Sequence, residues 1–183
     1  MKEVHEHWQT DRLHQIEPEE FFDLIQRNRK HIQKTFPGTL ERSKTLEDTI
    51  AFLYENVHKE ESGDGYYFYL RDTKSQMLIG YVLIKNVVRN IGKCEIAYFV
   101  DREFEGKGII TKAVSNLLEF CFGELSMNKV TICTSPENAA SQRIATKHGF
   151  KNEGMLRQEF KNGDGNLEDI FYFGLLKSNY DER

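Results

Sequence analysis

The feature that most constrains this chain is a glycine-containing stretch, Arg102-Glu-Phe-Glu-Gly-Lys-Gly-Ile-Ile-Thr111, set between two different hydrophobic patterns. Before it, residues 94–100 form a largely apolar run that is typical of a β-strand. After it, apolar residues recur every three or four positions from Ile110 to Phe122, which predicts one face of an α-helix. Gly106 and Gly108 therefore lie where a strand turns into a helix.

This junction has the chemistry of an anion site. The first N–H groups of a helix lack partners and carry a partial positive charge, and glycine lets the backbone approach a ligand with positive φ. A pyrophosphate site is the functional interpretation, although short Gly-x-Gly loops also occur without a ligand. The Walker A pattern and the third glycine of the Rossmann pattern are both absent. A loop that binds acetyl-CoA in an acyltransferase remains.

Length and composition limit the classes of protein to which this chain can belong. The 183 residues suit one domain spanning 1–183, with a sizeable core. Charged residues make up 30% and the net charge is −4, which argues against a general nucleic-acid binder and is compatible with a basic substrate. We see no secretory leader and no run of eighteen apolar residues, so we expect a cytoplasmic protein without a membrane partner.

Cysteines and histidines indicate no metal centre. Cys94, Cys121 and Cys133 each lie in an apolar run, which favours buried thiols in a reducing compartment over disulfides or metal ligands. His5 and His7 could touch a metal, but a solvated N-terminus is the favoured interpretation. We therefore predict no metal site.

The order of predicted elements indicates a mixed α/β domain. We expect helices from residue 17, over 45–57, from 109 to 122 and from 135 to 148. We expect strands at 10–14, 66–71, 77–84, 94–100 and 129–134, followed by one that begins at 154 and a final strand over 167–176. Residues 31–44, which contain Pro37-Gly38, are expected to be a connector or a short helix break, and residues 177–183 a polar tail.

Three motifs together resemble the GNAT superfamily of N-acetyltransferases. They are Glu105-Gly-Lys-Gly-Ile-Ile-Thr111, Asn138-Ala-Ala-Ser-Gln-Arg-Ile-Ala-Thr-Lys-His-Gly-Phe150 and Glu153-Gly-Met-Leu-Arg157. More narrowly, the chain resembles the RimJ/RimL type, which acetylates the N-termini of ribosomal proteins. The family loop is usually Gln/Arg-x-x-Gly-x-Gly/Ala, whereas Glu105 holds the first place here. The resemblance implies the GNAT fold, an α/β (α+β) domain with a mixed, mostly antiparallel sheet that is splayed at the acetyl-CoA site and flanked by helices.

The resemblance also implies where acetyl-CoA would bind. The pantetheine arm would pair with the strand backbone near Phe99 and Val100, much as an added β-strand does, and the pyrophosphate would meet the N–H groups of residues 107–111. Lys107 could offset phosphate charge, although a solvated lysine is equally expected. The implied cofactor-binding residues are Phe99, Val100, Gly106, Lys107, Gly108, Ile109, Ile110, Thr111 and Asn138.

Three residues are candidates for catalysis. Ser141 lies three residues after Asn138, on the same helix face, and the family suggests that its hydroxyl protonates the CoA thiolate. The alternative is that both residues only cap the helix. The resemblance places a glutamate that acts through water at Glu159 and, in other branches, a base at Glu95. Either could instead be an ordinary strand or surface carboxylate.

The pKa of the acceptor amine guides the choice of substrate. An α-amine has a pKa of about 7.7–8.0 and lysine about 10.4, so an enzyme for N-termini needs little help from a base. The resemblance implies an acyltransferase that moves acetyl from acetyl-CoA to the N-terminal α-amine of a ribosomal protein. An enzyme for a small amine, such as a polyamine or antibiotic, and a non-catalytic acyl-CoA-binding module remain open. Dimers are common in this branch, so a homodimer is also open.

Overall fold

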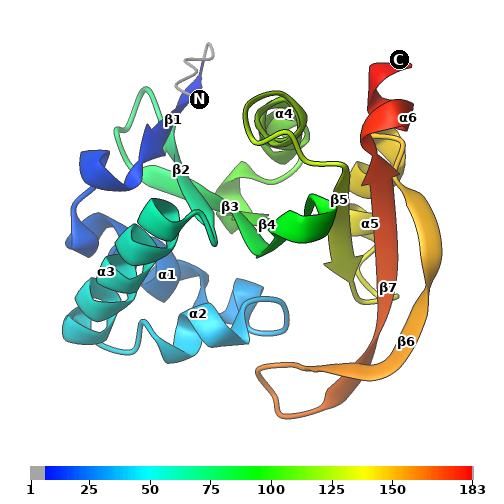
Figure 1. The fold of residues 1–183 in the computed structure, drawn as a ribbon. Helices are drawn as coiled ribbons and strands as arrows, with labels where there is room; N and C mark the ends of the chain where they lie inside the picture. Colours follow the sequence, from blue (N-terminus) through cyan, green and yellow to red (C-terminus); the bar gives the residue numbers. More distant parts are fainter. Residues whose placement is uncertain (1–6, 183) are drawn as a thin grey trace.

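The computed structural model describes residues 7–182, and its centre is one seven-stranded sheet (Figure 1). The strands lie in the order β1-β2-β3-β4-β5-β7-β6. Strands β4 and β5 are parallel to each other, and the other neighbouring strands are antiparallel. This confirms the predicted mixed, mostly antiparallel sheet. The strands are β1 (Trp8–Arg12), β2 (Tyr66–Asp72), β3 (Leu78–Val88), β4 (Lys93–Val100), β5 (Lys129–Thr134), β6 (Lys151–Lys161) and β7 (Leu167–Leu176).

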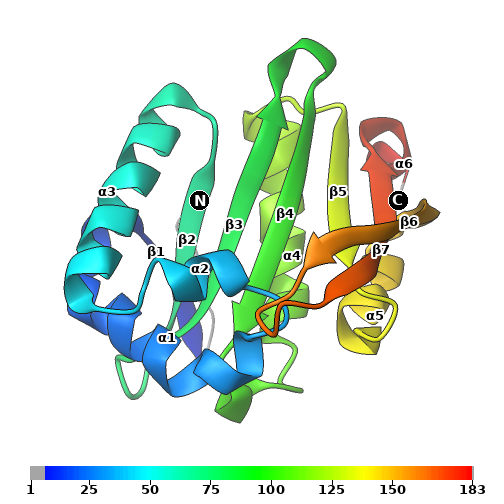
Figure 2. The same ribbon diagram turned by 90° about the horizontal axis from the view of Figure 1, so that it is seen from below.

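Helices flank the sheet on both faces (Figures 1 and 2). One face is covered by α4 and α5, and the opposite face by α1, α2 and α3. A short helix, α6, follows β7 at the chain end. The helices are α1 (Pro18–Ile32), α2 (Pro37–Glu41), α3 (Leu46–Ser62), α4 (Ile109–Glu119), α5 (Ala139–Lys147) and α6 (Lys177–Asp181).

Two apolar cores, one on each face, hold these layers together. On the first face, Val114 and Leu117 of α4 are fully buried against the sheet, where they meet Ile96 of β4. On the second face, Phe21 of α1 packs edge-on against Tyr69 with ring centres 5.3 Å apart. Because α4 and β4 pack in one core, the junction between them has a rigid support on both sides.

Local sequence explains where α3 begins and ends. The Thr45 hydroxyl accepts a hydrogen bond from the Asp48 N–H, and the Asp48 carboxylate accepts one from the Thr45 N–H, which is a capping box. The helix ends at Gly63, whose φ of +70° is the left-handed conformation that glycine tolerates. The cap predicted at residues 45–48 is confirmed.

Some predicted boundaries were wrong. The first strand begins at Trp8, earlier than residue 10, because Trp8 is buried and paired with Asp72. Residues 31–44 contain α2, because Pro37 is the first residue of that helix, a position that proline suits. The sixth strand begins at Lys151, where it pairs with β7 although its side chains are exposed.

The tail also differs from the expectation, since residues 177–181 form α6. Tyr180 packs on Phe122 with ring centres 4.8 Å apart, which gives this short helix a tertiary contact that its polar sequence does not reveal.

The thiols of all three cysteines are free, and those of Cys94 and Cys121 are buried with their sulfur atoms 3.8 Å apart. Within residues 7–182, His, Cys, Asp and Glu side chains form no group of three or more that could hold a metal ion. His5 lies outside the described residues. No helix in the described range has the length and apolar character required to cross a lipid bilayer.

Candidate functional site

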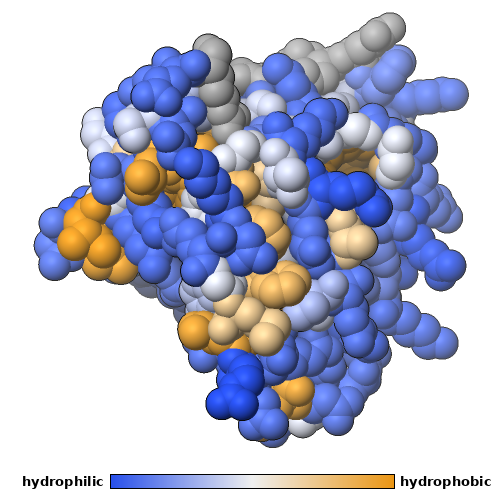
Figure 3. Space-filling view, turned by 90° about the vertical axis from the view of Figure 1, so that its right-hand side faces the viewer, coloured by the Kyte–Doolittle hydropathy of each residue, from blue (hydrophilic) through white to orange (hydrophobic). Residues whose placement is uncertain are grey.

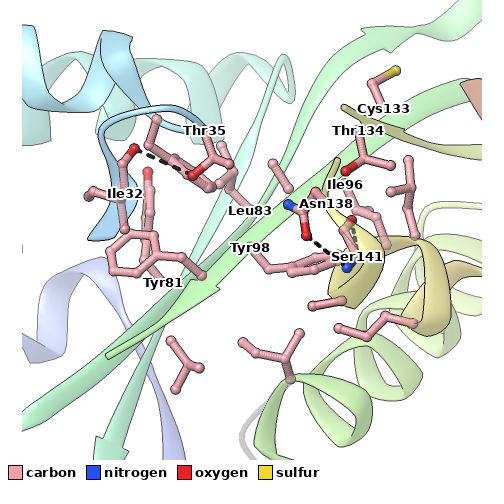
Figure 4. Close-up of a pocket in the computed structure, with 18 of the residues that line it drawn as sticks. Ile32, Thr35, Tyr81, Leu83, Ile96, Tyr98, Cys133, Thr134, Asn138 and Ser141 are labelled. Carbon is pink, nitrogen blue, oxygen red and sulfur yellow. Dashed lines mark hydrogen bonds between the residues drawn. The ribbon is translucent and has the colours of Figure 1, made fainter. Parts of the chain in front are cut away.

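The two parallel strands at the centre of the sheet separate and leave a cavity between them. β4 and β5 pair only along Lys93–Glu95 and Lys129–Thr131. Beyond these residues a cavity of about 1090 Å³ opens, with walls that include Ile96 and Ile132 from the diverging strands (Figure 4). The predicted splay is therefore confirmed. Strand edges that have lost their neighbour can offer backbone N–H and C=O groups to an extended ligand.

The glycine loop forms one end of this cavity. Gly106 and Gly108 have φ values of +72° and +76°, which few other residues adopt, and a Cβ at either position would meet nothing within 4 Å. Gly108 is the N-cap of α4, and within the described chain no side chain hydrogen-bonds to this cap. The backbone N–H groups of Ile109, Ile110 and Thr111 begin the helix and belong to residues of the cavity wall. The loop therefore combines open space with helix N-terminal donors.

Lys107 lies differently from its neighbours. Its Nζ is 4.3 Å from the centre of the Phe104 ring, and Lys107 is not part of the cavity wall, although Phe104 is. Its role toward phosphate stays a prediction.

Helix α1 holds the segment that leads into the glycine loop. The Nε of Arg27 donates to the Asp101 carboxylate at 2.5 Å, and the Asn28 side-chain oxygen accepts from the Arg102 N–H at 3.1 Å. Burial alone raises the pKa of Asp101, but hydrogen bonds from Asn28, Arg27 and the Glu103 N–H outweigh it and hold that pKa below its ordinary value. Two adjacent residues of α1 therefore fix the turn between β4 and the loop.

His31, one turn further along α1, reaches the same segment. Its Nε2 lies 3.2 Å from the Val100 carbonyl oxygen and 3.5 Å from the Glu105 carboxylate. The Glu105 side chain thus has a basic partner of its own, and the Val100 carbonyl already has a donor. Phe99 and Val100 both line the cavity, as a pantetheine-binding role would require.

Asn138 and Ser141, at the start of α5, also line this half of the cavity (Figure 4). The cap of α5 is the Asn138 side-chain oxygen, which accepts from the Ser141 N–H at 3.1 Å. Ser141 takes part in this cap only through its backbone. The Ser141 Oγ lies 3.0 Å from the Tyr98 hydroxyl, so the hydroxyl of Ser141 is available for a role other than capping.

Tyr98 is a member of this site that the sequence did not suggest. Burial raises its pKa to about 12, although the hydrogen bond with Ser141 opposes the shift. The phenol is therefore neutral at physiological pH and can donate a proton to the Ser141 Oγ or accept one from it. Tyr98 lies on the predicted strand, but its partner is 43 residues away, and strand periodicity alone carries no such information.

The carboxylates nominated as bases differ in position. Glu95 lines the cavity, where its carboxylate contacts the Lys85 Nζ at 3.1 Å and accepts from the Asn86 amide at 2.8 Å. Glu159 is exposed, lies outside the cavity wall, and accepts a hydrogen bond from the Tyr172 hydroxyl at 3.2 Å. The catalytic roles of both remain predictions.

Cys133 also lines the cavity, close to Glu95. Burial, together with the Glu95 charge, raises the pKa of its thiol to about 12. Because the thiolate is the nucleophilic form, this shift makes the Cys133 thiol a weaker nucleophile at neutral pH.

The cavity continues past the strands toward α1, α2 and α3. Its wall there is aromatic, with Phe36 packed edge-on against Phe99 at 5.1 Å between ring centres and Tyr81 next to Phe99 at 6.1 Å. Tyr81 and Thr35 lie across the cavity from Asn138 and Ser141 (Figure 4). The two halves of the cavity thus differ: helix N-termini and hydroxyls at one end, aromatic rings at the other.

A hairpin tip bridges this second half. The N–H of Gly163, between β6 and β7, donates to the Gln33 carbonyl at 3.1 Å, and the Gln33 amide donates to Asp164 at 2.6 Å. A Cβ on Gly163 would lie 2.3 Å from the Gln33 oxygen, so this close approach needs glycine. Figure 2 shows the tip beside the chain that leads from α1 to α2. The surface on the β6–β7 side is mainly hydrophilic, with separate apolar spots (Figure 3).

Two basic residues of α5 were also missed. Arg143 and Lys147 are exposed, lie four residues apart on one helix face, and both line the cavity. Two cationic residues four positions apart, within the motif that begins at Asn138, are the sequence signal from which Arg143 and Lys147 could have been identified.

Comparison with known proteins gives one family. A family model described as "Acetyltransferase (GNAT) domain" matches residues 12–151. Curated relatives include YdaF of Bacillus subtilis (strain 168), 36% identical over 104 residues, a match that spans 57% of this chain and 56% of YdaF. The ribosomal-protein-serine acetyltransferase of Escherichia coli (strain K12) is 27% identical over 142 residues, 77% of this chain and 78% of that protein. The spermidine N(1)-acetyltransferase of the same organism is 30% identical over 89 residues, 49% of this chain and 46% of that protein.

Solved structures match the fold over nearly the whole chain. The ribosomal-protein-S5-alanine acetyltransferase from Vibrio fischeri has a TM-score of 0.88 at 22% identity and covers 98% of both chains. RimL, a ribosomal L7/L12 alpha-N-protein acetyltransferase in complex with coenzyme A, has a TM-score of 0.84 at 16% identity and covers 97% of this chain and 98% of its own.

Proposed function

Because the chain belongs to the GNAT acetyltransferase family, we propose that it transfers the acetyl group of acetyl-CoA to the α-amine of a protein N-terminus, most specifically that of a ribosomal protein. One observation carries the proposal. The split between β4 and β5, the glycine-capped start of α4 and the Ser141–Tyr98 pair all border the same cavity. Cofactor, leaving group and amine would therefore meet in one place.

The residues of the cavity fit acetyl-CoA. The open space at Gly106 and Gly108 and the N–H groups that start α4 suit a pyrophosphate, and the strand edge near Phe99 suits the pantetheine arm. Arg143 and Lys147 add positive charge on α5 toward a ligand with several phosphates. Acetyl-CoA, when bound, supplies an acetyl group already activated as a thioester.

Each catalytic group has a proton task. The Ser141 Oγ would give a proton to the leaving thiolate while the neutral Tyr98 hydroxyl holds it by a hydrogen bond, and the proton that the amine gives up would return to Ser141 through solvent once the products leave. The Glu95 carboxylate would accept the proton that the amine loses, either directly or through water. Glu159, nominated by the family resemblance, would need water to reach the cavity from its exposed position.

Two observations support an N-terminal amine. The E. coli relative is named for ribosomal-protein-serine acetylation, and RimL for α-N-acetylation of ribosomal L7/L12. In addition, the hairpin tip docked on Gln33 borders the aromatic half of the cavity, which we call the amine half because the proposed function places the acceptor amine there. A bridged entry suits a flexible chain end better than a lysine on a folded surface.

A small linear amine is the alternative substrate, and the match to a spermidine N(1)-acetyltransferase favours it specifically. A polyamine would also pass a bridged entry, and the Glu95 carboxylate in the wall would suit its charge.

The test uses matched amines at pH 7 with acetyl-CoA. One peptide has a free N-terminus and no lysine, a second has the same sequence with a blocked N-terminus and one lysine, and spermidine is the third acceptor. We expect the free N-terminus to be acetylated fastest, because about a tenth of it is already neutral, against well under a thousandth of lysine. Faster acetylation of spermidine would select the alternative. CoA binding without transfer to any of the three would contradict both and favour a non-catalytic module.

A further inference from the structure

One half-buried carboxylate of the cavity wall has no assigned role. Glu168, on β7, lines the amine half of the cavity and is half-buried. Its neighbour in the register is Phe160 of β6, which also lines the cavity. Glu168 therefore borders the cavity in which the proposed function would place the incoming amine.

The neighbouring Asn162 orients this carboxylate. Asn162 is 5% exposed, and its side-chain nitrogen donates to the Glu168 Oε1 at 2.5 Å. Its side-chain oxygen accepts from the N–H groups of Asp164 and Asn166, so the amide itself is fixed by the turn. Glu168 is thus a preorganised acceptor rather than a mobile surface side chain.

Charge and burial distinguish Glu168 from the other carboxylates in this wall, because Glu105 lies 3.5 Å from the His31 Nε2 and Glu137 is exposed. Glu95 is already compensated, because its carboxylate contacts the Lys85 ammonium and the Asn86 amide. Within residues 7–182, no cationic side chain lies within ion-pair distance of Glu168, and Asn162 is its hydrogen-bond partner. A half-buried carboxylate without a cation gains most when a cation arrives with the ligand.

We propose that Glu168, oriented by Asn162, is a specificity-determining residue that receives the positive charge of the incoming amine. This inference rests on the function proposed above and adds the chemical class that the site selects: an acceptor that carries an ammonium group at the entry to the cavity. The docked hairpin tip serves this role, because the contact of Gly163 with Gln33 fixes the turn that holds Asn162.

The experiment is steady-state kinetics on the full chain, with acetyl-CoA and the free-N-terminus peptide varied in turn. Glu168→Gln keeps the size of the side chain and removes its charge, and Glu168→Asp keeps the charge. The matched control is Asp169→Asn. Asp169 is the next residue of β7, lies outside the cavity wall, and accepts a backbone hydrogen bond from Gln158 that Asn also accepts.

We expect Glu168→Gln to raise KM for the amine about tenfold, since charge-assisted hydrogen bonds are roughly twice as strong as neutral ones. KM for acetyl-CoA should stay within about twofold, Glu168→Asp should lie between Gln and wild type, and Asp169→Asn should match wild type.

Two results would overturn the proposal, and they are distinguishable. If the wild type is active and Glu168→Gln has the same KM for the amine, only the role of Glu168 is overturned. A wild type that neither binds CoA, measured by thermal shift, nor transfers acetyl overturns the proposed function together with it. If Glu168→Gln fails to fold, Glu168→Asp must still raise the amine KM selectively, and an equal change in both KM values would assign Glu168 to structure only.

Discussion

At the scale of single residues, the pair of hydroxyls at the split of the sheet is the informative feature. Ser141 could have been a cap and nothing more, but Asn138 provides that cap and leaves the Ser141 Oγ bonded to Tyr98. Burial keeps the Tyr98 phenol neutral, with a pKa of about 12. A neutral phenol hydrogen-bonded to a serine can orient the serine hydroxyl and stabilise the oxygen from which a proton is leaving.

This leads to a prediction for Ser141→Ala. The variant should keep CoA binding and lower kcat by roughly 10²-fold, because general acid catalysis contributes about 10²–10⁴-fold. The helix cap should survive, since alanine retains the N–H that donates to Asn138. The measurement is kcat together with CoA-induced thermal stabilisation. Tyr98→Phe, which leaves the serine in place, should lower kcat less, and an unchanged kcat in folded Ser141→Ala would remove Ser141 from the mechanism.

At the scale of elements, two helices build the proposed phosphate site. Helix α4 supplies its N-terminus through Gly108, while α1 holds the preceding turn through Arg27, Asn28 and His31. The loop is therefore held by α4, the helix that follows it in the chain, and by α1, a helix that packs on the opposite face of the sheet. Such support keeps the N–H groups oriented before a ligand arrives, which lowers the cost of binding.

Gly108→Val should abolish the stabilisation of the protein by CoA. Saturation at a hundred times Kd should stabilise the wild type by about 2.7 kcal/mol, and valine would place a branched side chain in the open space at a φ of +76°. The readout is the Tm with and without CoA. Gly165→Val is the matched control, because Gly165 also has a positive φ, +86°, and open surroundings but lies in the hairpin tip. Loss of the CoA shift in both variants would mean that general strain, not the phosphate site, is responsible.

At the scale of the whole molecule, the core on the α1–α3 face contains an unusual number of tyrosines. Tyr69 and Tyr81 are fully buried, and burial raises the pKa of each well above its ordinary value of 10.0. Tyr67, beside them, has a pKa raised to about 12 by burial. The folded state therefore retains phenolic protons that the unfolded chain would release.

This predicts a specific loss of stability in alkali. The pKa values of these phenols are higher in the folded state than in the unfolded chain. Their contribution to the free energy of unfolding is therefore complete below pH 10, and for Tyr67 and Tyr98 it is lost as pH rises from 10 toward 12. The free energy of unfolding should begin to fall as pH approaches 9.0, the ordinary pKa of the partly buried Cys133 thiol, and should fall more steeply above pH 10. Urea titrations across this range, with phenolate absorbance recorded in parallel, provide the measurement. Phenolate absorbance before unfolding that exceeds the share of the exposed tyrosines, such as Tyr54, would contradict the burial argument.

The sequence by itself determined the features that depend on short-range geometry. The junction at Gly106 and Gly108 was predictable because positive φ and a change of period are local properties. The same holds for the cap of α3 and for Asn138 and Ser141 on one helix face, since a spacing of three residues fixes their relation on any helix. The sheet with its splay followed from the family motifs, and it is confirmed.

Only the tertiary structure decided which side chains face the cavity. Glu159 could not be placed by counting residues, because β6 has a bulge between Leu156 and Phe160 and Gln158 has a φ of +53°, which breaks the alternation of the strand. The contact of Arg27 with Asp101 spans 74 residues, and the contact of Gln33 with Asp164 spans 131. Such pairs form because packing of whole elements brings them together, and no local pattern in the chain records that packing.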